Sequence, residues 1–346
     1  MPISAVDLFC GAGGLSHGLL RAGISVSAGF DLDESCRYAF EHNNRPAKFY
    51  AVDVSALTGE MIRSAMPEGN IRLLAGCAPC QPFSTYSLGK TSSDDVKWSL
   101  LTEFGRLVVE VQPDIVTMEN VPKLQHHPVF GKFKNMLSML GYYVSYQVVD
   151  CVEYGIPQTR KRLVLLASRL GPIQLRSRDP RRDKRRLVRH VIGRLEPLPA
   201  GGISERDDLH RASAVSTVNL RRLKVSQPGG TWKDWDEHLV ADCHRLESGS
   251  TFVGVYGRMS WDEASPTITT QFYGFGNGRF GHPVQDRALS LREGAMLQTF
   301  PANYRFVEPG KPIRFKTVGR MVGNAVPVRL GQVIGESILE HVSRMS

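Results

Sequence analysis

The sequence predicts an α/β protein with a doubly wound, mostly parallel, Rossmann-like sheet and a smaller irregular module inserted in its second half. Two observations carry this prediction. Short apolar runs alternate with helix-like periods over the first half, which is typical of βαβ units and a parallel sheet. After Ser168 the character changes, because arginines and then prolines and glycines break any regular period.

The first elements follow one another as strand and helix. Ile3–Phe9 reads as a buried strand and Leu15–Ala22 as the helix after it; Ser25–Phe30 and Glu34–His42 repeat this order. Amphipathic spacing predicts a helix over Leu101–Val111. Continuous short apolar runs predict three further strands, at Phe49–Val52, Ile71–Ala75 and Ile115–Met118.

The later elements define the domain organisation. Tyr142–Val149 and Arg162–Ala167 are strand-like without a helix between them, so an antiparallel hairpin is expected at the sheet edge. Regular structure resumes at Ser290–Thr299, and Val322–Val342 reads as one long helix. We therefore expect a first domain over residues 1–170, completed by 285–346, and an inserted module over 171–284.

Composition excludes several classes of protein. Of 346 residues, 42% are hydrophobic and 22% charged, which is ordinary for a globular chain. No apolar run approaches the ~20 residues of a membrane span, and the first residues lack the pattern of a signal peptide. Six cysteines at scattered spacings suit a reducing cytosol rather than a disulfide scaffold, so a cytoplasmic protein is expected.

Positive charge is concentrated in one segment. The chain carries a net charge of +9, and Arg169–Arg194 holds ten basic residues against two acidic ones. Such a local cationic run indicates a polyanionic partner. The alternative is a solvated, partly disordered basic loop, since blocks of like charge often stay disordered.

A glycine-rich turn follows the first strand. Gly11 and Gly13 stand between that strand and the next helix, where backbone N–H groups are free and a ligand can approach closely. The dinucleotide fingerprint fails because Ser16 replaces its third glycine. Asp31, twenty residues after Gly11, is placed to bind the hydroxyls of an adenosine ribose. The pattern favours an adenosine cofactor without a pyrophosphate; the alternative is a purely structural turn.

A second motif contains a candidate nucleophile. Cys80 lies between Pro79 and Pro82, just after the predicted strand at Ile71–Ala75, at the edge where open α/β sheets place their sites. A thiol there becomes nucleophilic if positive charge lowers its pKa. The alternatives are a redox pair with Cys77 or half of a zinc site. Proline after the pair argues against the first, and the lack of further paired ligands argues against any metal.

Two more polar motifs end or begin strands. Glu119 ends the strand at Ile115–Met118, which places a carboxylate beside the Cys80 loop; the alternative is a helix-capping acid. Arg160 and Arg162 open the last strand of the first half. In an extended chain they point to the same side, toward one anionic group; the alternative is a basic surface strand.

The combined motifs resemble those of the DNA (cytosine-5) methyltransferases, in the bacterial restriction–modification form. The resemblance runs from Asp7 to about Leu339 and lapses only between about 170 and 285, where the family's target-recognition domain varies. The motifs, in order, are Phe9-Cys10-Gly11-Ala12-Gly13-Gly14, Pro79-Cys80-Gln81, Glu119-Asn120-Val121, Gln158-x-Arg160-x-Arg162, Arg287 with Arg292-Glu293, and Gly323-Asn324-Ala325-Val326-Pro327.

The resemblance implies a mechanism. Family members transfer a methyl group from S-adenosylmethionine to C5 of a cytosine flipped out of double-stranded DNA. Cys80 would add to cytosine C6, and Glu119 would hold the N3 and N4 edge of the base. Arg160 and Arg162 would position the base and the catalytic loop. Arg287, Arg292 and Glu293 would be structural.

The resemblance also implies a cofactor site. Asp31 would bind the ribose of S-adenosylmethionine and Asp53 the adenine amino group. The other residues expected to line this pocket are Phe9, Gly11, Gly13, Leu15, Leu32, Pro79 and Asn324.

The partner expected from the resemblance is double-stranded DNA, with no membrane, and with a restriction endonuclease acting separately. We expect a monomer in the cytoplasm, associated with the nucleoid. One alternative is a tRNA cytosine-5 methyltransferase, disfavoured because Cys243 is followed by His244-Arg245 rather than by that branch's Cys-Phe-Thr signature. A catalytically silent DNA-binding protein and a Cys-x-x-Cys oxidoreductase are the others.

Overall fold

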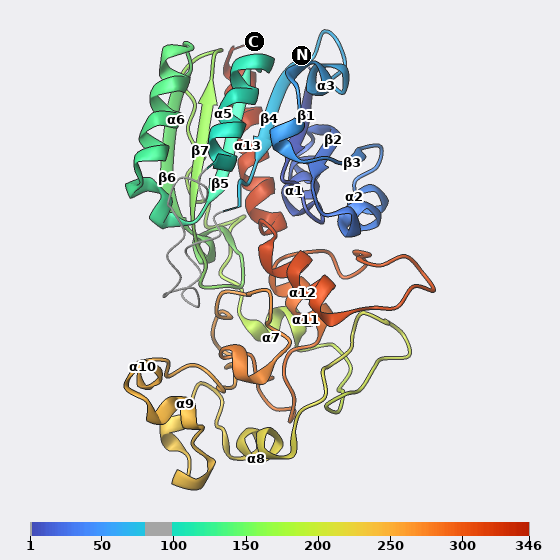
Figure 1. The fold of residues 1–346 in the computed structure, drawn as a ribbon, viewed down its shortest axis with the longest axis vertical. Coiled ribbons are helices and arrows are strands. Elements are labelled where there is room, and N and C mark those ends of the chain that lie inside the picture. Colours follow the sequence, from blue (N-terminus) through green and yellow to red (C-terminus); the bar gives the residue numbers. More distant parts are fainter. Residues whose placement is uncertain (1, 80–98, 346) are drawn as a thin grey trace. The chain divides into compact units, whose positions relative to one another are not determined.

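The computed structural model describes residues 2–79 and 99–345, which form two compact units (Figure 1). Unit 1 contains residues 1–154, 161–183 and 325–346; unit 2 contains 155–160 and 184–324. These boundaries differ from those expected. Residues 171–183 join unit 1 because Arg176 pairs with Glu336, whereas 285–324 join unit 2 because Arg292 pairs with Asp207.

Unit 1 contains a seven-stranded sheet of order β3-β2-β1-β4-β5-β7-β6. The first five strands pair in parallel, and β7 is antiparallel to both of its neighbours. The predicted α/β fold is therefore confirmed, and so is the antiparallel hairpin at the sheet edge. The strands are β1 (Ile3–Leu8), β2 (Ser25–Asp31), β3 (Lys48–Ala51), β4 (Ile71–Gly76), β5 (Ile115–Asn120), β6 (Tyr143–Asp150) and β7 (Lys161–Ser168).

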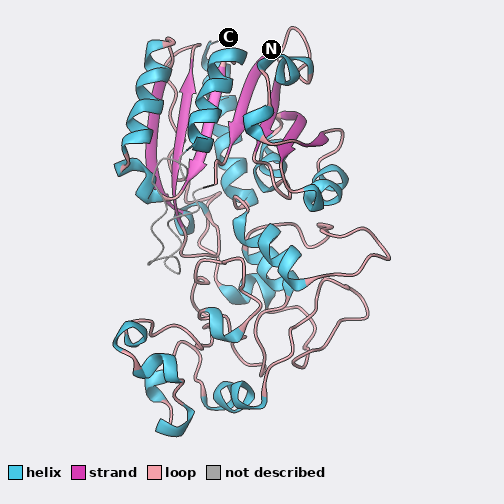
Figure 2. Ribbon diagram, in the orientation of Figure 1, coloured by secondary structure: helices cyan, strands magenta, loops and turns pink. Residues whose placement is uncertain are grey.

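Helices cover both faces of this sheet (Figure 2). Side chains of α3, α5 and α6 share one apolar core with the strands, and α1 packs with α13 on the other side (Figure 1). The α-helices of unit 1 are α1 (Gly14–Ala22), α2 (Arg37–Asn43), α3 (Gly59–Ser64), α5 (Ser99–Val111), α6 (Pro128–Met139) and α13 (Val328–Met345). Its 3-10 helices are η1 (Glu34–Cys36), η2 (Val54–Ala56), η3 (Pro122–His126) and η4 (Cys151–Tyr154).

Glycines let α1 and α13 approach backbone to backbone. A Cβ atom on Gly18 would lie 2.5 Å from the carbonyl oxygen of Val328, and one on Gly331 would lie 2.9 Å from that of Leu15. Both distances are below the range that real Cβ contacts show, so any side chain at either position would force the helices apart.

The prediction of a single long helix over Val322–Val342 is wrong. The structure has two helices there, because α12 (Phe315–Asn324) ends before Pro327 and α13 begins at Val328. Proline lacks the N–H that a helix interior requires and disfavours helical backbone at the preceding residue, Val326. Helix α6, between β5 and β6, was not expected.

Unit 2 is irregular. Within its described residues it contains short helices and turns but no strand longer than an isolated bridge. A small aromatic core includes Trp232, Trp235 and Phe275. Its helices are α7 (Val188–Ile192), α8 (Thr217–Val225), α9 (Asp242–Arg245), α10 (Glu247–Ser250), α11 (Leu291–Leu297) and α12, with 3-10 helices η5 (Trp232–Asp234), η6 (Glu237–Leu239) and η7 (Phe275–Asn277).

Buried arginines hold unit 2 together. Arg287 is fully buried and donates to both carboxylate oxygens of Glu293, each at 2.7 Å. Glu293 also caps α11 by accepting from the backbone N–H of Ser290 at 2.7 Å. Arg292 pairs with Asp207 and donates to the carbonyl of Tyr304 at 3.0 Å. The structural role expected for these three motif residues is confirmed.

Candidate active site

The glycine-rich turn lies at the carboxyl edge of the parallel strands. Phe9, Gly11 and Gly13 have positive φ angles of 58°, 50° and 86°. Glycine adopts this region freely, but for Phe9 it is strained, and such strain clusters at functional sites. Gly13 is the N-cap of α1, and Leu15 is buried in its first turn.

Asp31 braces this turn at the end of β2. Its two carboxylate oxygens accept hydrogen bonds from the backbone N–H groups of Gly11 and Asp33, both at 2.8 Å. A Cβ atom on Gly11 would meet no atom of the described residues within 4 Å, so none of them fills the space at this turn. Leu32 follows with its side chain 70% exposed. A carboxylate, a glycine turn and an exposed apolar side chain fit the ribose and adenine of a nucleoside cofactor.

Ser16 has a defined contact below the turn. Its hydroxyl donates to the carboxylate of Asp7 at 2.6 Å, and both residues are buried. Burial raises the pKa of Asp7 to about 7, against the opposing effect of the Ser16 hydrogen bond. The serine that breaks the dinucleotide fingerprint therefore satisfies a buried carboxyl group.

The remaining cofactor candidates are distributed over both units. Asp53 follows β3 and is exposed; hydrogen bonds from the Ser55 N–H and hydroxyl lower the pKa of its carboxyl. Pro79 is exposed after β4. Asn324 is the exposed last residue of α12, in unit 2.

Glu119 lies at the carboxyl end of β5 and is 2% exposed. Its Oε1 atom is 2.8 Å from Nε of Arg162 on β7, and its Oε2 atom accepts a hydrogen bond from the thiol of Cys77 at 3.0 Å. The neighbouring Asn120 donates to the carbonyl of Ala78 at 3.0 Å, which ties β5 to the segment after β4. A buried carboxylate is thus held in one orientation beside the chain that leads to Cys80.

The two arginines of the fourth motif have different described partners. Arg162 is partly exposed and pairs with Glu119 in unit 1. Arg160 is buried in unit 2, where it donates to the carbonyls of Ile268 at 3.1 Å and Gly323 at 3.5 Å. Among the described residues, the two guanidiniums do not share one anionic group.

Cys80 lies outside the described residues, so its role stays a prediction. The sequence pattern indicates Cys77 only as a possible redox or metal partner, so its contact with Glu119 is a finding of the structure. The contact of Asn120 with Ala78 is a second such finding. The adjacency of Asn120 to Glu119 was the available signal, because residues at the end of a strand often fix the neighbouring loop.

The parallel sheet and the glycine-rich turn at its carboxyl edge define a Rossmann-like α/β enzyme. Residues 3–340 match the model of the C-5 cytosine-specific DNA methylase family, so the chain belongs to that family. It is a DNA (cytosine-5) methyltransferase, and enzymes of this family and fold use S-adenosylmethionine as methyl donor.

Similar proteins support this assignment. The chain is 52% identical to the type II methylase M.HgiDII of Herpetosiphon aurantiacus, over 97% of this chain and 94% of that protein. It is 31% identical to the type II methyltransferase M1.BsuMI of Bacillus subtilis, over 96% and 79%. A prophage-encoded E. coli protein assigned as a DNA modification methyltransferase has the same fold, with a TM-score of 0.74, 21% identity and 99% coverage of both chains.

No helix in the two described ranges is long and apolar enough to cross a membrane.

Proposed function

We propose that this enzyme is the methyltransferase of a type II restriction–modification system and methylates one cytosine within a specific double-stranded sequence. The similarity to M.HgiDII over nearly the whole of both chains carries this proposal. In it, unit 1 performs the chemistry and unit 2 recognises the target. The enzyme acts as a monomer in the cytoplasm, near the nucleoid, and a cognate endonuclease acts separately.

The covalent step is assigned to Cys80. Its thiolate adds to C6 of the flipped-out cytosine, which breaks the ring's aromaticity and gives C5 the electron density of an enamine. After methylation, loss of the C5 proton and departure of the Cys80 thiolate restore the aromatic ring. As the C5–methyl bond forms, the sulfur–methyl bond of the donor breaks and S-adenosylhomocysteine is the leaving group. The C5 proton passes to solvent, so no external oxidant or reductant is needed.

Glu119 is assigned to the N3 and N4 edge of the base. The ion pair with Arg162 and the hydrogen bond from Cys77 orient its carboxylate in advance, so little reorganisation is needed when the base arrives. Arg162, the ion-pair partner of Glu119, also contacts the edge of the base. Arg160, which is buried among main-chain carbonyls, keeps the positioning role that the family resemblance implies.

Bound S-adenosylmethionine supplies the electrophilic methyl group. The residues assigned to hold it are Asp31 at the ribose and Asp53 with Leu32 at the adenine. The glycine-rich turn and Leu15 line the methionine end, and Phe9, Pro79 and Asn324 complete the pocket. The space at Gly11 beside the Asp31 carboxylate, which no described residue fills, is consistent with a ligand of this kind.

Bisulfite sequencing of DNA from cells that express the enzyme tests the proposal. Wild type should protect one cytosine in one sequence context, and Cys80→Ala should protect none. Cys77→Ser, which keeps a hydrogen-bond donor for Glu119, is the matched control and should still methylate. Methylation by the Cys80→Ala variant, or methyl transfer to RNA but to no DNA, would contradict the proposal.

A further inference from the structure

The basic segment 178–186 contains five cations that pair with no described residue, two of them in unit 1 and three, from residue 184 onward, in unit 2. Arg178, Arg181, Lys184, Arg185 and Arg186 are exposed, and their side chains make no hydrogen bond or ion pair with any residue that the structure describes. Asp179 and Asp183 are the acidic residues of the segment, and both are engaged: the Asp179 carboxylate accepts from the backbone N–H of Arg181 at 2.9 Å. An unneutralised cationic array on one short stretch of chain favours an anionic ligand.

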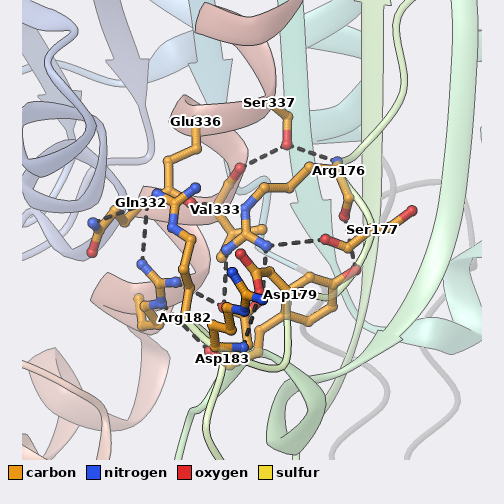
Figure 3. Close-up of polar contacts among 12 residues, drawn as sticks. Arg176, Ser177, Asp179, Arg182, Asp183, Gln332, Val333, Glu336 and Ser337 are labelled. Atoms are coloured by element: carbon orange, nitrogen blue, oxygen red, sulfur yellow. Dashed lines mark hydrogen bonds and ion pairs between the residues drawn. The ribbon is translucent and has the colours of Figure 1, made fainter.

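This segment is anchored rather than loose. Arg176 is buried and donates to both carboxylate oxygens of Asp183, at 2.7 and 2.9 Å (Figure 3). The Asp183 carboxylate also accepts from the backbone N–H of Asp179 at 2.8 Å. Backbone bonds from Arg182 and Asp183 to the carbonyl of Asp179 close the turn between them. The expectation of a partly disordered loop is wrong for residues 176–183.

Helix α13 provides the other half of the anchor. Glu336 accepts from Nε of Arg176 at 2.7 Å and pairs with Arg182 at 3.0 Å. Arg329 donates to Asp183 at 2.8 Å and to Glu336 at 3.2 Å. The hydroxyl of Ser337 accepts from the backbone N–H of Arg176 at 2.9 Å. All these residues belong to unit 1.

Within the anchor, the carboxyl group of Asp183 is stabilised in its ionised form. Burial alone would raise the pKa of Asp183, but hydrogen bonds from Arg176, the Asp179 N–H and Arg329 outweigh it and hold the pKa well below its usual value. Two buried carboxylates between three guanidiniums are costly to desolvate, and they are satisfied only in this one arrangement. The network therefore fixes a conformation more than it adds stability.

We propose that this anchor, built from Arg176, Asp183, Arg329 and Glu336, presents the unpaired cations Arg178 and Arg181, which belong to the same unit, to the phosphates of duplex DNA. The inference rests on the proposed function, since DNA is the polyanion that the enzyme must hold. Phosphate contacts set the position of a protein on the duplex without reading its sequence. Ordering the segment before binding lowers the entropy lost when DNA arrives. The anchor residues act as positioning residues and need not touch DNA.

The first experiment removes charge from the segment. A variant with Arg178→Gln and Arg181→Gln is compared with a control that has Arg21→Gln and Arg45→Gln. The control removes the same charge from exposed positions elsewhere on unit 1. Binding of the full chain to cognate and unrelated duplexes is measured by fluorescence anisotropy over a range of salt. We expect the segment variant to bind both duplexes at least about tenfold more weakly at low salt and to flatten the slope of log affinity against log salt by up to ~1.8.

The control should keep the wild-type slope, because uniform loss of net charge acts only weakly at a distance. The methylated sequence should be the same in all three proteins. An unchanged affinity and slope in the segment variant would overturn the inference, and so would an altered methylation site, which would mean that these side chains read bases.

The second experiment breaks the anchor and leaves every exposed cation in place. Asp183→Asn and, separately, Glu336→Gln each make the protein more positive by one charge, so electrostatics alone predicts tighter DNA binding. If the anchor positions the segment, we expect the opposite result, namely weaker binding to both duplexes and faster tryptic cleavage within residues 178–186. Asp183→Glu, which keeps the charge, should recover part of the loss. Tighter binding by both neutralised variants would overturn the positioning role.

The proposed function and the proposed role of the anchor can be contradicted independently of each other. S-adenosylmethionine binding and the melting temperature are recorded for each variant, so that only folded proteins are compared. If wild type methylates DNA and the segment variant binds as wild type does, the inference alone is wrong. If wild type methylates no DNA, the proposed function is wrong, whatever the salt slopes show.

Discussion

Units 1 and 2 satisfy their buried backbone groups in different ways. In unit 1, strands and helices pair their own backbone groups, and the core between them is apolar, with Phe104, Phe130 and Leu165 fully buried. In unit 2, the described chain forms short helices and turns, and buried guanidiniums bind the carbonyls that have no ladder partner. Arg258 alone donates to the carbonyls of Leu223 and His282, at 2.8 and 2.9 Å.

Because of this difference, the two units should tolerate different kinds of substitution. An apolar core tolerates exchanges of similar volume, because total volume and pattern are what it requires. A buried arginine that satisfies several carbonyls has no substitute of equal geometry, since its donors form a planar fork. The guanidine group of Arg287, for example, donates to Glu293, to the side chain of Gln285 and to the carbonyls of Leu198 and Ala288.

The largest effect is expected at Arg287. Arg287→Met fills much of the same volume but leaves Glu293 as an unpaired buried carboxylate, so we expect a loss of about 3–5 kcal/mol in the free energy of unfolding. Urea denaturation of the full chain measures it. A loss below about 1 kcal/mol would show that unit 2 does not depend on its buried ion pairs, and the contrast with unit 1 would fail.

A smaller effect is expected at the cofactor site of unit 1. Asp31→Ala should weaken S-adenosylmethionine binding by roughly 1.5–3 kcal/mol, the scale of hydrogen bonds to a charged group. Isothermal calorimetry with the free enzyme measures it, and Glu60→Ala, on the exposed side of α3, is the control. Unchanged affinity would remove Asp31 from the site.

The two units should respond to pH with opposite sign. Burial raises the pKa of Asp7 in unit 1 to about 7, so its contribution to stability is complete below about pH 4 and is lost as pH rises to 7. Burial lowers the pKa of His282 in unit 2 to about 4, so its contribution is complete above about pH 6.5 and is lost as pH falls to 4.

Urea titrations of the full chain between pH 4 and 7.5 separate these contributions. Relative to wild type, Asp7→Asn should gain stability as pH rises, whereas His282→Gln should gain it as pH falls. If the free energy of unfolding of both variants changes with pH just as that of wild type does, neither group titrates as its burial suggests.

The smallest effect is expected at an exposed ion pair. In α13, Nη2 of Arg344 lies 3.9 Å from Oε2 of Glu340. The two side chains are 70% and 46% exposed. Arg344→Met should change the free energy of unfolding by no more than about 0.5 kcal/mol, and this is the matched control for Arg287→Met. A loss comparable with that at Arg287 would mean that burial is not what distinguishes the two arginines.

The sequence predicted what depends on local pattern. The five parallel strands, the antiparallel hairpin and the glycine-rich turn were all expected, because apolar alternation and glycine spacing are read over a few residues. The break between α12 and α13 was missed although Pro327 marks it, because the apolar period continues on both sides.

Long-range pairing could not be predicted. Arg176 was counted among the cations available to a partner, yet it is buried against Glu336, which lies 160 residues further along the chain. The contact of Cys77 with Glu119 joins two strand ends 42 residues apart. Charge and spacing identify such residues as candidates, but only the fold decides which carboxylate each one meets.

The close packing of α1 against α13 affects how the chain folds during synthesis. The two helices are separated by about 300 residues, so at about 5–20 residues per second the ribosome needs roughly 15–60 s to make the second after the first. During that time the glycine surface of α1 has no partner, while all of unit 2 has already been made. We therefore expect the irregular unit to fold first and the catalytic sheet to close last. A nascent chain stalled before α13 should expose the α1 side of the sheet to chaperones.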